Sequence, residues 1–339
     1  MKIPREIKYS QTLQFTNEAK AKKSKGEKII SLGLGEPIFE TPKEIVQSTY
    51  KAIKNGYTKY SNPYGLKELR ELIKEELLRE NNIDVSINNI IVTPGAKPAL
   101  FLSLMAILEP NDEIILFTPC YVSYIPQIRL AEPKAVIKNI DLLKENFSID
   151  WKRLKNNFSK KTKAILLNFP HNPTGKILND GEFKDLIEFL MENACYIISD
   201  EVYEKLNFSK IPHYSPASIK KLRDRVITIN GFSKAYSMTG WRIGYLVANK
   251  DLTRTISKLN QHINANTCTF IQKGVCSAFS LSSNFLSEYK EGLKKKAKFM
   301  YNILSKNKRL DIIPPRGGLF SFLNISKTGM NSDNSPQTY

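Results

Sequence analysis

Five short apolar runs recur along the middle of the chain and constrain its fold more than any other feature. They cover residues 90–93, 113–117, 164–168, 196–199 and 225–230. Runs that are this short and this rich in β-forming apolar residues predict strands buried on both faces. Two segments carry apolar stripes at helical spacing, one before the first run and one between the third and the fourth: Leu69, Leu72, Ile73 and Leu77, and Phe183, Leu186, Ile187 and Leu190. The alternation predicts an α/β fold, with a mostly parallel central sheet and helices on both faces.

Reactive or conformationally special residues follow each predicted strand. The segments concerned are 94–98, 118–121, 169–175, 200–203 and 231–234. Ligands of open α/β sheets bind beyond the carboxyl ends of the strands, so we expect these five loops to converge on one pocket.

Two of these loops allow both a functional and a purely structural interpretation. Gly95 and Ala96 precede an apolar helix, whose free backbone N–H groups can bind phosphate or simply form an entry turn. We expect Pro98 at the first helical position. Residues 171–175, His-Asn-Pro-Thr-Gly, are ordinary turn residues as well as candidate ligands.

Each of the remaining candidates, considered alone, can also be either functional or structural. Asp200 can serve a ligand or cap a turn, because an aspartate after a strand is common in both settings. Tyr121 and Tyr203 can be ordinary core aromatics. Lys234 is one of many lysines, so its position gains weight only from its neighbours.

The order and spacing of these motifs resemble the class I/II pyridoxal-phosphate (PLP) aminotransferases. Residues 233–245, Ser-Lys-Ala-Tyr-Ser-Met-Thr-Gly-Trp-Arg-Ile-Gly-Tyr, are similar to the cofactor-lysine segment of that family. Residues 171–175 and 199–203 resemble two further hallmarks, and residues 34–37 and 59–65 extend the resemblance toward the start. The chain is most similar to the bacterial-type aspartate aminotransferase branch.

The resemblance covers about residues 28–330 and implies a fold-type I PLP-dependent transferase. Lys234 would hold PLP as a Schiff base and, once displaced by the substrate amine, would move the proton between Cα and C4′. Asp200 would keep the pyridine nitrogen protonated. Asn172 and Tyr203 would hydrogen-bond the phenolic oxygen of PLP, and Tyr121 would stack on its ring.

The resemblance also implies how the phosphate group is bound. Arg242 would offer it a permanently charged fork. Backbone and hydroxyl groups of Gly95, Ala96 and Ser233 would complete the cradle, with Lys97 beside it. Tyr60 would reach the phosphate of a neighbouring subunit, which implies a homodimer.

Three residues would face the substrate, again by resemblance. Gly35 would lie where a side chain does not fit, and Asn172 would line the same space. Lys97 would recognise the distal carboxylate of a dicarboxylic substrate, so aspartate and glutamate are expected. The alternative is that Lys97 only adds positive charge near the phosphate.

The 339 residues suggest two domains. We expect a large PLP-binding domain over residues 45–285. Residues 1–44 and the start of a C-terminal segment, 286–339, would form a smaller domain, with a helix that carries Phe285, Tyr289, Leu293, Phe299, Met300 and Ile303.

Members of the family continue well beyond the segment that residues 314–320 resemble, and there supply the arginine that clamps the substrate α-carboxylate. This chain ends at Tyr339, and its last stretch, 332–339, is polar and without periodicity. We therefore expect a truncated small domain, retained PLP binding and weak transamination, unless Arg316 provides the clamp.

Composition excludes several other classes of protein. The net charge is +18, but the lysines largely alternate with glutamates, so we expect no nucleic-acid role. Four widely spaced cysteines and three histidines predict reduced thiols and no metal site. No apolar stretch reaches the roughly 20 residues of a membrane span, and no secretory signal begins the chain, so a cytoplasmic location is expected.

These features predict a PLP-dependent aminotransferase that moves an amino group between an L-amino acid and a 2-oxoacid in a ping-pong reaction. One alternative is a PLP-dependent lyase or decarboxylase, because the same fold supports cleavage of other bonds at Cα. The other is a truncated PLP-binding protein without enzymatic activity.

Overall fold

A computed structural model of the chain describes residues 7, 9–30, 32–33 and 35–329. Its centre is a seven-stranded sheet in the order β1-β7-β6-β5-β4-β2-β3. The strands are β1 (Ile90–Thr93), β2 (Glu113–Thr118), β3 (Val136–Asp141), β4 (Thr162–Asn168), β5 (Tyr196–Asp200), β6 (Val226–Gly231) and β7 (Gly244–Val247). Only β7 runs antiparallel to its neighbours. The predicted mostly parallel sheet is confirmed.

The five predicted strands form β1, β2, β4, β5 and β6, and two further strands of this sheet were not predicted. β3 pairs in parallel with β2 at one edge of the sheet, and most of its residues are half-buried or exposed. It lacks a continuous apolar run because an edge strand has one side open to water. β7 is fully buried but begins at Gly244, inside the segment that resembles the lysine motif.

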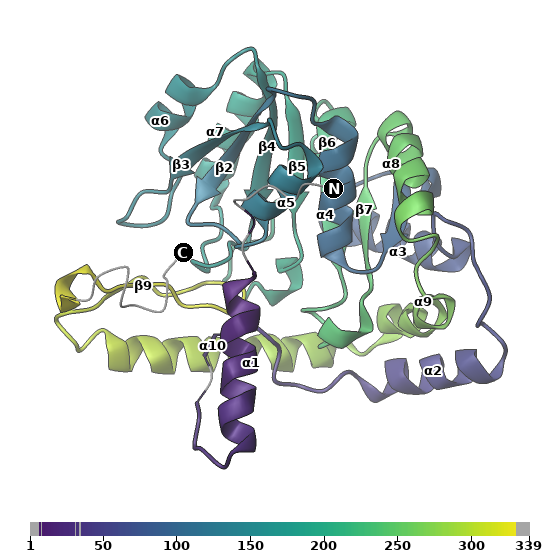
Figure 1. The fold of residues 1–339 in the computed structure, drawn as a ribbon, viewed down its shortest axis with the longest axis horizontal. Coiled ribbons are helices and arrows are strands. Elements are labelled where there is room, and N and C mark those ends of the chain that lie inside the picture. Colours follow the sequence, from purple (N-terminus) through teal and green to yellow (C-terminus); the bar gives the residue numbers. More distant parts are fainter. Residues whose placement is uncertain (1–6, 8, 31, 34, 330–339) are drawn as a thin grey trace.

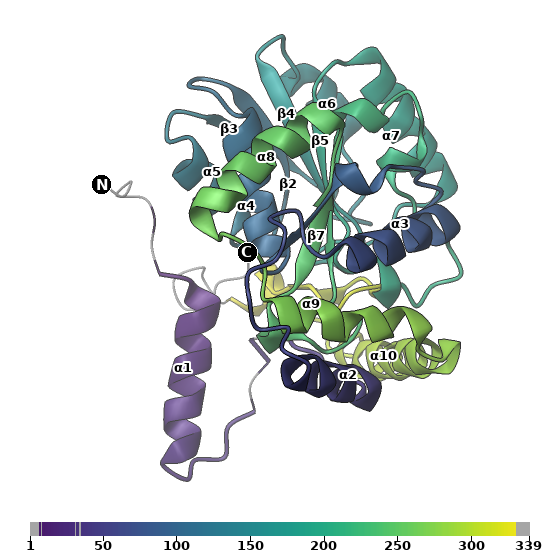
Figure 2. The same cartoon turned by 90° about the vertical axis from the view of Figure 1, so that its right-hand side faces the viewer.

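Helices cover both faces of the sheet, as predicted (Figures 1 and 2). Buried apolar residues of α4, α5 and α8 form one core cluster, and those of α3, α6 and α7 belong to a second on the other face. The helices are α1 (Gln11–Ser24), α2 (Lys43–Lys54), α3 (Lys67–Asn81), α4 (Ala96–Ile107), α5 (Tyr124–Ala131), α6 (Trp151–Asn157), α7 (Asp180–Glu192), α8 (Lys250–Ile263), α9 (Thr269–Val275) and α10 (Ser283–Leu304).

Two details of the helices were not predicted. α4 begins at Ala96, so Pro98 is its third residue and not its first. Proline is tolerated there because the N–H groups of the first turn have no partner within the helix. The polar face of α3 is not wholly solvated, since Arg70 and Glu76 are both buried.

The remaining elements lie below the sheet in Figure 1. There α10 runs beneath the sheet and α2 packs against α9, while α1 projects away from the body in both views. Two short strands, β8 (Asp311–Ile312) and β9 (Leu323–Asn324), pair after α10. The helix expected around Tyr289 is confirmed as α10. The domain boundaries stay a prediction, and the expected irregular end at 332–339 lies outside the described residues.

The four cysteines are free, as predicted, and Cys195 is the one that is buried. None of the helices within the described ranges combines the length and the apolar character needed to cross a membrane.

Candidate active site

The loops after β4 and β5 are joined by hydrogen bonds of Asn168, the last residue of β4. Its Nδ2 donates to the backbone oxygen of Asp200 at 2.9 Å, and its Oδ1 accepts from the backbone N–H of Asn172 at 2.8 Å. Because β4 and β5 are parallel neighbours, their carboxyl ends meet at one sheet edge. Asn172 and Asp200 are thereby held in the same region.

Asp200 ends β5 with its carboxylate buried. Oδ2 accepts a 2.7 Å hydrogen bond from the hydroxyl of Tyr124, and Oδ1 accepts one from the backbone N–H of Val202 at 3.3 Å. Burial raises the pKa of Asp200 to about 6, although both hydrogen bonds favour the ionised form. A buried carboxylate held at this edge suits a cationic ring nitrogen.

Lys234 follows β6 and its amine is largely buried. Nζ donates a 2.7 Å hydrogen bond to the backbone oxygen of Gly35 and lies 5.9 Å from the ring centroid of Tyr203. Burial lowers the pKa of Lys234 to about 8, and the charge of Arg242 adds to this effect. An amine with a lowered pKa is a better nucleophile near neutral pH, since more of it is uncharged.

Tyr203 brings a third loop residue to the site. Its side chain is buried, and its hydroxyl lies 3.5 Å from Nδ2 of Asn172. Burial and the nearby Asp200 raise the pKa of the Tyr203 hydroxyl well above its usual range, so it stays protonated.

A cradle for an anion lies where α4 begins. Gly95 precedes the helix with a φ of 96°, and no side chain caps the helix there. A Cβ on Gly95 would lie 2.6 Å from Nη2 of Arg242, so only glycine lets the guanidinium approach this closely. Arg242 also donates to the backbone oxygens of Thr239 at 2.9 Å and Pro94 at 3.3 Å. Fixed N–H groups and a permanent cation together suit a phosphate.

The other predicted residues take varied positions. Tyr121 contacts the ring of Tyr124 edge-to-face at 5.4 Å, and Nζ of Lys97 lies 5.7 Å from the Tyr121 centroid. Ser233 is buried next to Lys234. The structure does not bring Tyr60 into this cluster, and its side chain is 90% exposed.

A side chain does not fit at Gly35, and the place of Gly35 beside a substrate stays a prediction. A Cβ there would lie 2.1 Å from the ring of Phe320, so the close neighbour is this aromatic ring. Phe320 also contacts Tyr203 edge-to-face at 6.2 Å. It lies in the segment 314–320 that resembles the family, but its place beside the lysine loop was not predicted.

Two other features were missed. One is the hydrogen bond from Tyr124 to Asp200. The only sequence feature that pointed to Tyr124 is its position three residues after the candidate Tyr121. A group of metal-ligand type, Glu201, Glu204 and His213, has its ligand atoms within 4.8 Å of one another, although no metal site was expected. Charged residues in a loop are usually solvated, so no local pattern indicated that Glu201 and Glu204 are buried and His213 partly so.

The residues present fit PLP: an amine for its aldehyde, a carboxylate for its ring nitrogen and a cradle for its phosphate. Fold and site thus define a PLP-dependent enzyme of fold type I. The chain belongs to the family described as aminotransferase class I and II, whose profile matches residues 27–335. It is an aminotransferase that uses PLP and acts on an amino acid and a 2-oxoacid.

Proteins similar to this chain in sequence and structure are named as aminotransferases. The chain is 38% identical to a probable aspartate/prephenate aminotransferase of Aquifex aeolicus, over 94% of this chain and 82% of that protein. The crystal structure of an aspartate aminotransferase from Thermotoga maritima is 35% identical, with a TM-score of 0.85 over 92% of this chain and 82% of that one. An aromatic aminotransferase from Pyrococcus horikoshii is 32% identical, with a TM-score of 0.86 over 93% and 85%.

Proposed function

We propose that this chain transfers the amino group of aspartate or glutamate to a 2-oxoacid, with Lys234 as the residue that binds PLP covalently. The observation that carries the proposal is the environment of Lys234. It is a buried amine with a lowered pKa, on the loop after β6 and close to Tyr203. Lys234 would bond to the aldehyde carbon with loss of water, and the incoming substrate amine would displace it. Its freed Nζ would then accept the Cα proton and return it at the adjacent carbon of the cofactor.

Asp200 and its neighbours would set the electronic state of the cofactor. PLP, when bound, supplies a ring that withdraws electrons from Cα of the substrate. The Asp200 carboxylate would accept a hydrogen bond from the protonated ring nitrogen, which gives this buried anion a cationic partner. Tyr203 and Asn172 would donate to the phenolic oxygen, and Tyr121 would lie against the ring face.

The cradle at the start of α4 would hold the phosphate. Arg242 would bind two of its oxygens, while the backbone N–H groups of Gly95 and Ala96 and the hydroxyl of Ser233 would bind the remainder. Anchoring the phosphate fixes the cofactor relative to Lys234, so the reacting atoms keep their alignment during turnover.

Lys97 supports a dicarboxylic substrate. It is exposed in the first turn of α4, beside Tyr121. Within the described part of the chain no carboxylate forms an ion pair with it, which leaves its ammonium group free for a distal carboxylate. The names of the relatives from Aquifex and Thermotoga agree with aspartate. Aromatic substrates are a second candidate, favoured by the Phe320 ring beside Tyr203.

We further propose that the chain acts as a homodimer. Tyr60 is 90% exposed, as expected of a residue that serves the site of a second copy. The same end of the chain exposes several large apolar side chains, which a partner surface would cover: Ile30, Leu32, Ile38, Val46, Tyr50 and Ile53. Sedimentation of the purified protein with and without Tyr60→Ala, together with PLP affinity, tests this arrangement.

The activity itself is tested by mixing the purified chain with PLP and aspartate, glutamate, alanine or phenylalanine. We expect aspartate and glutamate to yield their 2-oxoacids and to convert the cofactor to pyridoxamine phosphate. Release of carbon dioxide or of an eliminated fragment would instead assign lyase or decarboxylase chemistry. A preference for phenylalanine would favour the second candidate.

A further inference from the structure

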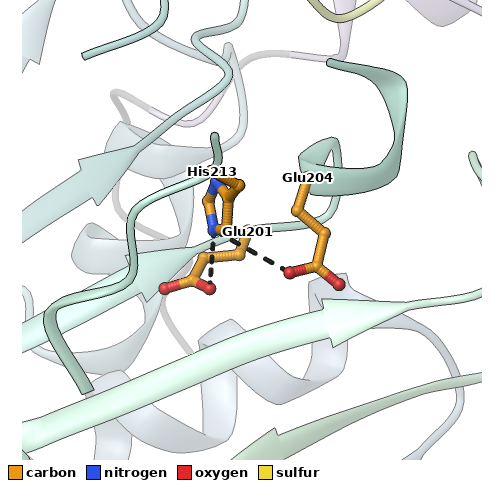
Figure 3. Close-up of side chains that lie close together, drawn as sticks. All are labelled: Glu201, Glu204 and His213. Carbon is orange, nitrogen blue, oxygen red and sulfur yellow. Dashed lines mark hydrogen bonds and ion pairs between the residues drawn. The ribbon is translucent and has the colours of Figure 1, made fainter. Parts of the chain in front are cut away.

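The turn that carries Asp200 and Tyr203 has a second charged side. Side chains alternate along β5, so Ser199 and Glu201 face opposite to Asp200. Figure 3 shows the imidazole of His213 beside the carboxylates of Glu201 and Glu204. Nε2 of His213 lies 3.0 Å from Oε2 of Glu201 and 3.8 Å from Oε2 of Glu204.

Both carboxylates are buried and held by further donors. Oε1 of Glu201 accepts 2.7 Å hydrogen bonds from the hydroxyls of Ser199 and Ser215. Oε2 of Glu204 accepts a 2.6 Å hydrogen bond from Nδ2 of Asn81 on α3. The side chains of Glu201 and Glu204 are only 1% and 7% exposed, so solvent screens their mutual repulsion weakly.

A cation is therefore needed between the two carboxylates. Lys205, which follows Glu204 in the chain, already forms 2.6 Å ion pairs with Glu76 and Glu80 of α3. Two buried carboxylates near one another cannot both stay ionised without a positive partner. His213 is the side chain in position to supply that charge.

We propose that protonated His213 is a positioning residue: it bridges Glu201 and Glu204 and so fixes the turn that presents Asp200 and Tyr203 to the cofactor. The proposal rests on the roles of Asp200 and Tyr203 proposed above. His213 touches neither cofactor nor substrate, and it acts through the turn. Glu201 directly follows β5 and Glu204 begins the helical turn Glu204–Leu206, so the imidazole that lies beside both in Figure 3 joins two points of one loop.

The electrostatics of His213 agree with a retained proton. Burial opposes its charge, but the hydrogen bond to Glu201 and the charges of Glu201 and Glu204 outweigh this, and its pKa is raised. The titratable groups around the triad come from several elements: Glu201 after β5, Glu204 and Lys205 in the following turn, Glu76 and Glu80 of α3, Tyr236 after β6, and Tyr245 of β7.

Loss of the proton would act directly on the backbone of the turn. The N–H of Glu201 donates to the oxygen of Ile229 on β6 at 2.8 Å, and the N–H of Glu204 donates to the oxygen of Glu201 at 2.9 Å. Repulsion between the carboxylates would strain these bonds. Tyr203 lies between the two glutamates, so the contact of its hydroxyl with Asn172 would loosen.

A bound metal ion is the competing interpretation of the same three side chains. The oxygens of Glu201 are already used by two hydroxyl donors and by His213. A hydroxyl donor and a metal compete for the same carboxylate lone pairs, so the observed contacts favour a proton. The experiment below separates the two interpretations.

The test compares His213→Gln with the double variant His213→Gln, Glu204→Gln in the full chain. His262→Gln, at an exposed position of α8, is the matched control. The first measurement is the titration of the histidine ring signals in the cofactor-free protein, where His213 is identified by its loss in the variant. The second is the dissociation constant of PLP near neutral pH, with circular dichroism as the check on folding.

We expect His213 to stay protonated to a pH above the usual histidine value of about 6.5. His213→Gln should raise the dissociation constant of PLP by about tenfold, and the added Glu204→Gln should restore it to within about threefold, because the unpaired charge is gone. A purely structural contribution of the imidazole would give no such rescue. Additive losses in the double variant therefore overturn the proposal.

Two other results are decisive. A neutral His213 at neutral pH, or a stoichiometric metal whose removal by EDTA weakens PLP binding, overturns the proposal, since no proton would then bridge the carboxylates. Failure of the wild-type chain to bind PLP would overturn the proposed function instead. The titration in the cofactor-free protein would still decide whether the charged triad exists.

Discussion

The hydroxyl of Tyr124 donates a 2.7 Å hydrogen bond to Oδ2 of Asp200, in a region where both side chains are buried. Two effects on the carboxylate therefore oppose each other. Burial favours its protonated form, and the hydrogen bond favours its ionised form, which leaves the pKa of Asp200 at about 6. The ionised form is the one that a cationic cofactor nitrogen requires.

Asp200 should destabilise the cofactor-free protein at neutral pH. The pKa of Asp200 is raised in the folded state. Its favourable contribution to folding stability is therefore complete below its pKa in the unfolded chain, and it is lost as the pH rises to about 6. A shift of about two units corresponds to about 3 kcal/mol. Relative to wild type, Asp200→Asn should therefore gain up to about 3 kcal/mol in unfolding free energy between about pH 4 and pH 8.

Urea unfolding of both cofactor-free proteins measures this difference, and Asp185→Asn on the exposed face of α7 is the control. If the difference in unfolding free energy between the two proteins does not change with pH, the Asp200 carboxylate is not desolvated. With PLP bound, the wild-type protein should be the more stable of the two, because the neutral amide of the Asp200→Asn variant offers no charge to the ring nitrogen.

Lys234 should be the residue that forms the covalent adduct with PLP. Borohydride reduction followed by peptide mass spectrometry should place the adduct on Lys234 in the wild-type chain. Lys234→Ala should lose it, while the exposed Lys221→Ala keeps it. An adduct found on Lys97 would require the roles of the two lysines to be exchanged.

The reactivity of Lys234 should follow its lowered pKa. The amine is uncharged above about pH 8, so the rate of adduct formation should rise with pH and level off there. An ordinary lysine would keep gaining reactivity toward its usual pKa of about 10.4. Using pyridoxal, which lacks the phosphate, keeps binding to Arg242 out of the measurement. A rate that still climbs well above pH 8 contradicts the buried position.

The sequence predicted those parts of the fold in which local pattern and burial agree. β4, β5 and β6 are almost wholly buried because helices cover both of their faces, so their short runs rich in apolar residues were sufficient. β3 was missed because an edge strand is partly solvated and includes Lys138 and Asn139. Its pairing with β2 becomes visible only in three dimensions.

The site residues, too, were predictable where a local pattern exists and not where distant segments meet. The lysine, aspartate and turn motifs were found because their residue types and order are informative by themselves. The bond between Tyr124 and Asp200 joins residues 76 positions apart and depends on where α5 begins. The burial of Glu201 and Glu204 depends on α3 and on the segment of His213. No local pattern contains that information.

Lys97 should select for dicarboxylic substrates. Lys97→Ala should lower kcat/KM for aspartate more than for alanine, by about 1.5 to 3 kcal/mol if a charged hydrogen bond is lost. Lys221→Ala controls for the loss of one positive charge at the surface. Equal losses for both amino acids would assign Lys97 to the phosphate of the cofactor.

Tyr124→Phe should weaken the cofactor site without altering any group that contacts the substrate. The variant keeps the ring, and with it the contact with Tyr121, but removes the donor that stabilises the ionised carboxylate of Asp200. The pKa of Asp200 should then rise further above about 6, since burial acts with one hydrogen bond fewer against it.

The loss of a hydrogen bond to a charged group corresponds to about 1.5 to 3 kcal/mol, so the dissociation constant of PLP at pH 7 should increase by about 10- to 150-fold. The loss should shrink as the pH is raised, because a higher pH ionises Asp200 again. PLP affinity measured from about pH 6 to pH 9 in both proteins tests this, with Tyr196→Phe as a control. A loss that is constant with pH would mean that Tyr124 acts by packing alone and does not set the charge of Asp200.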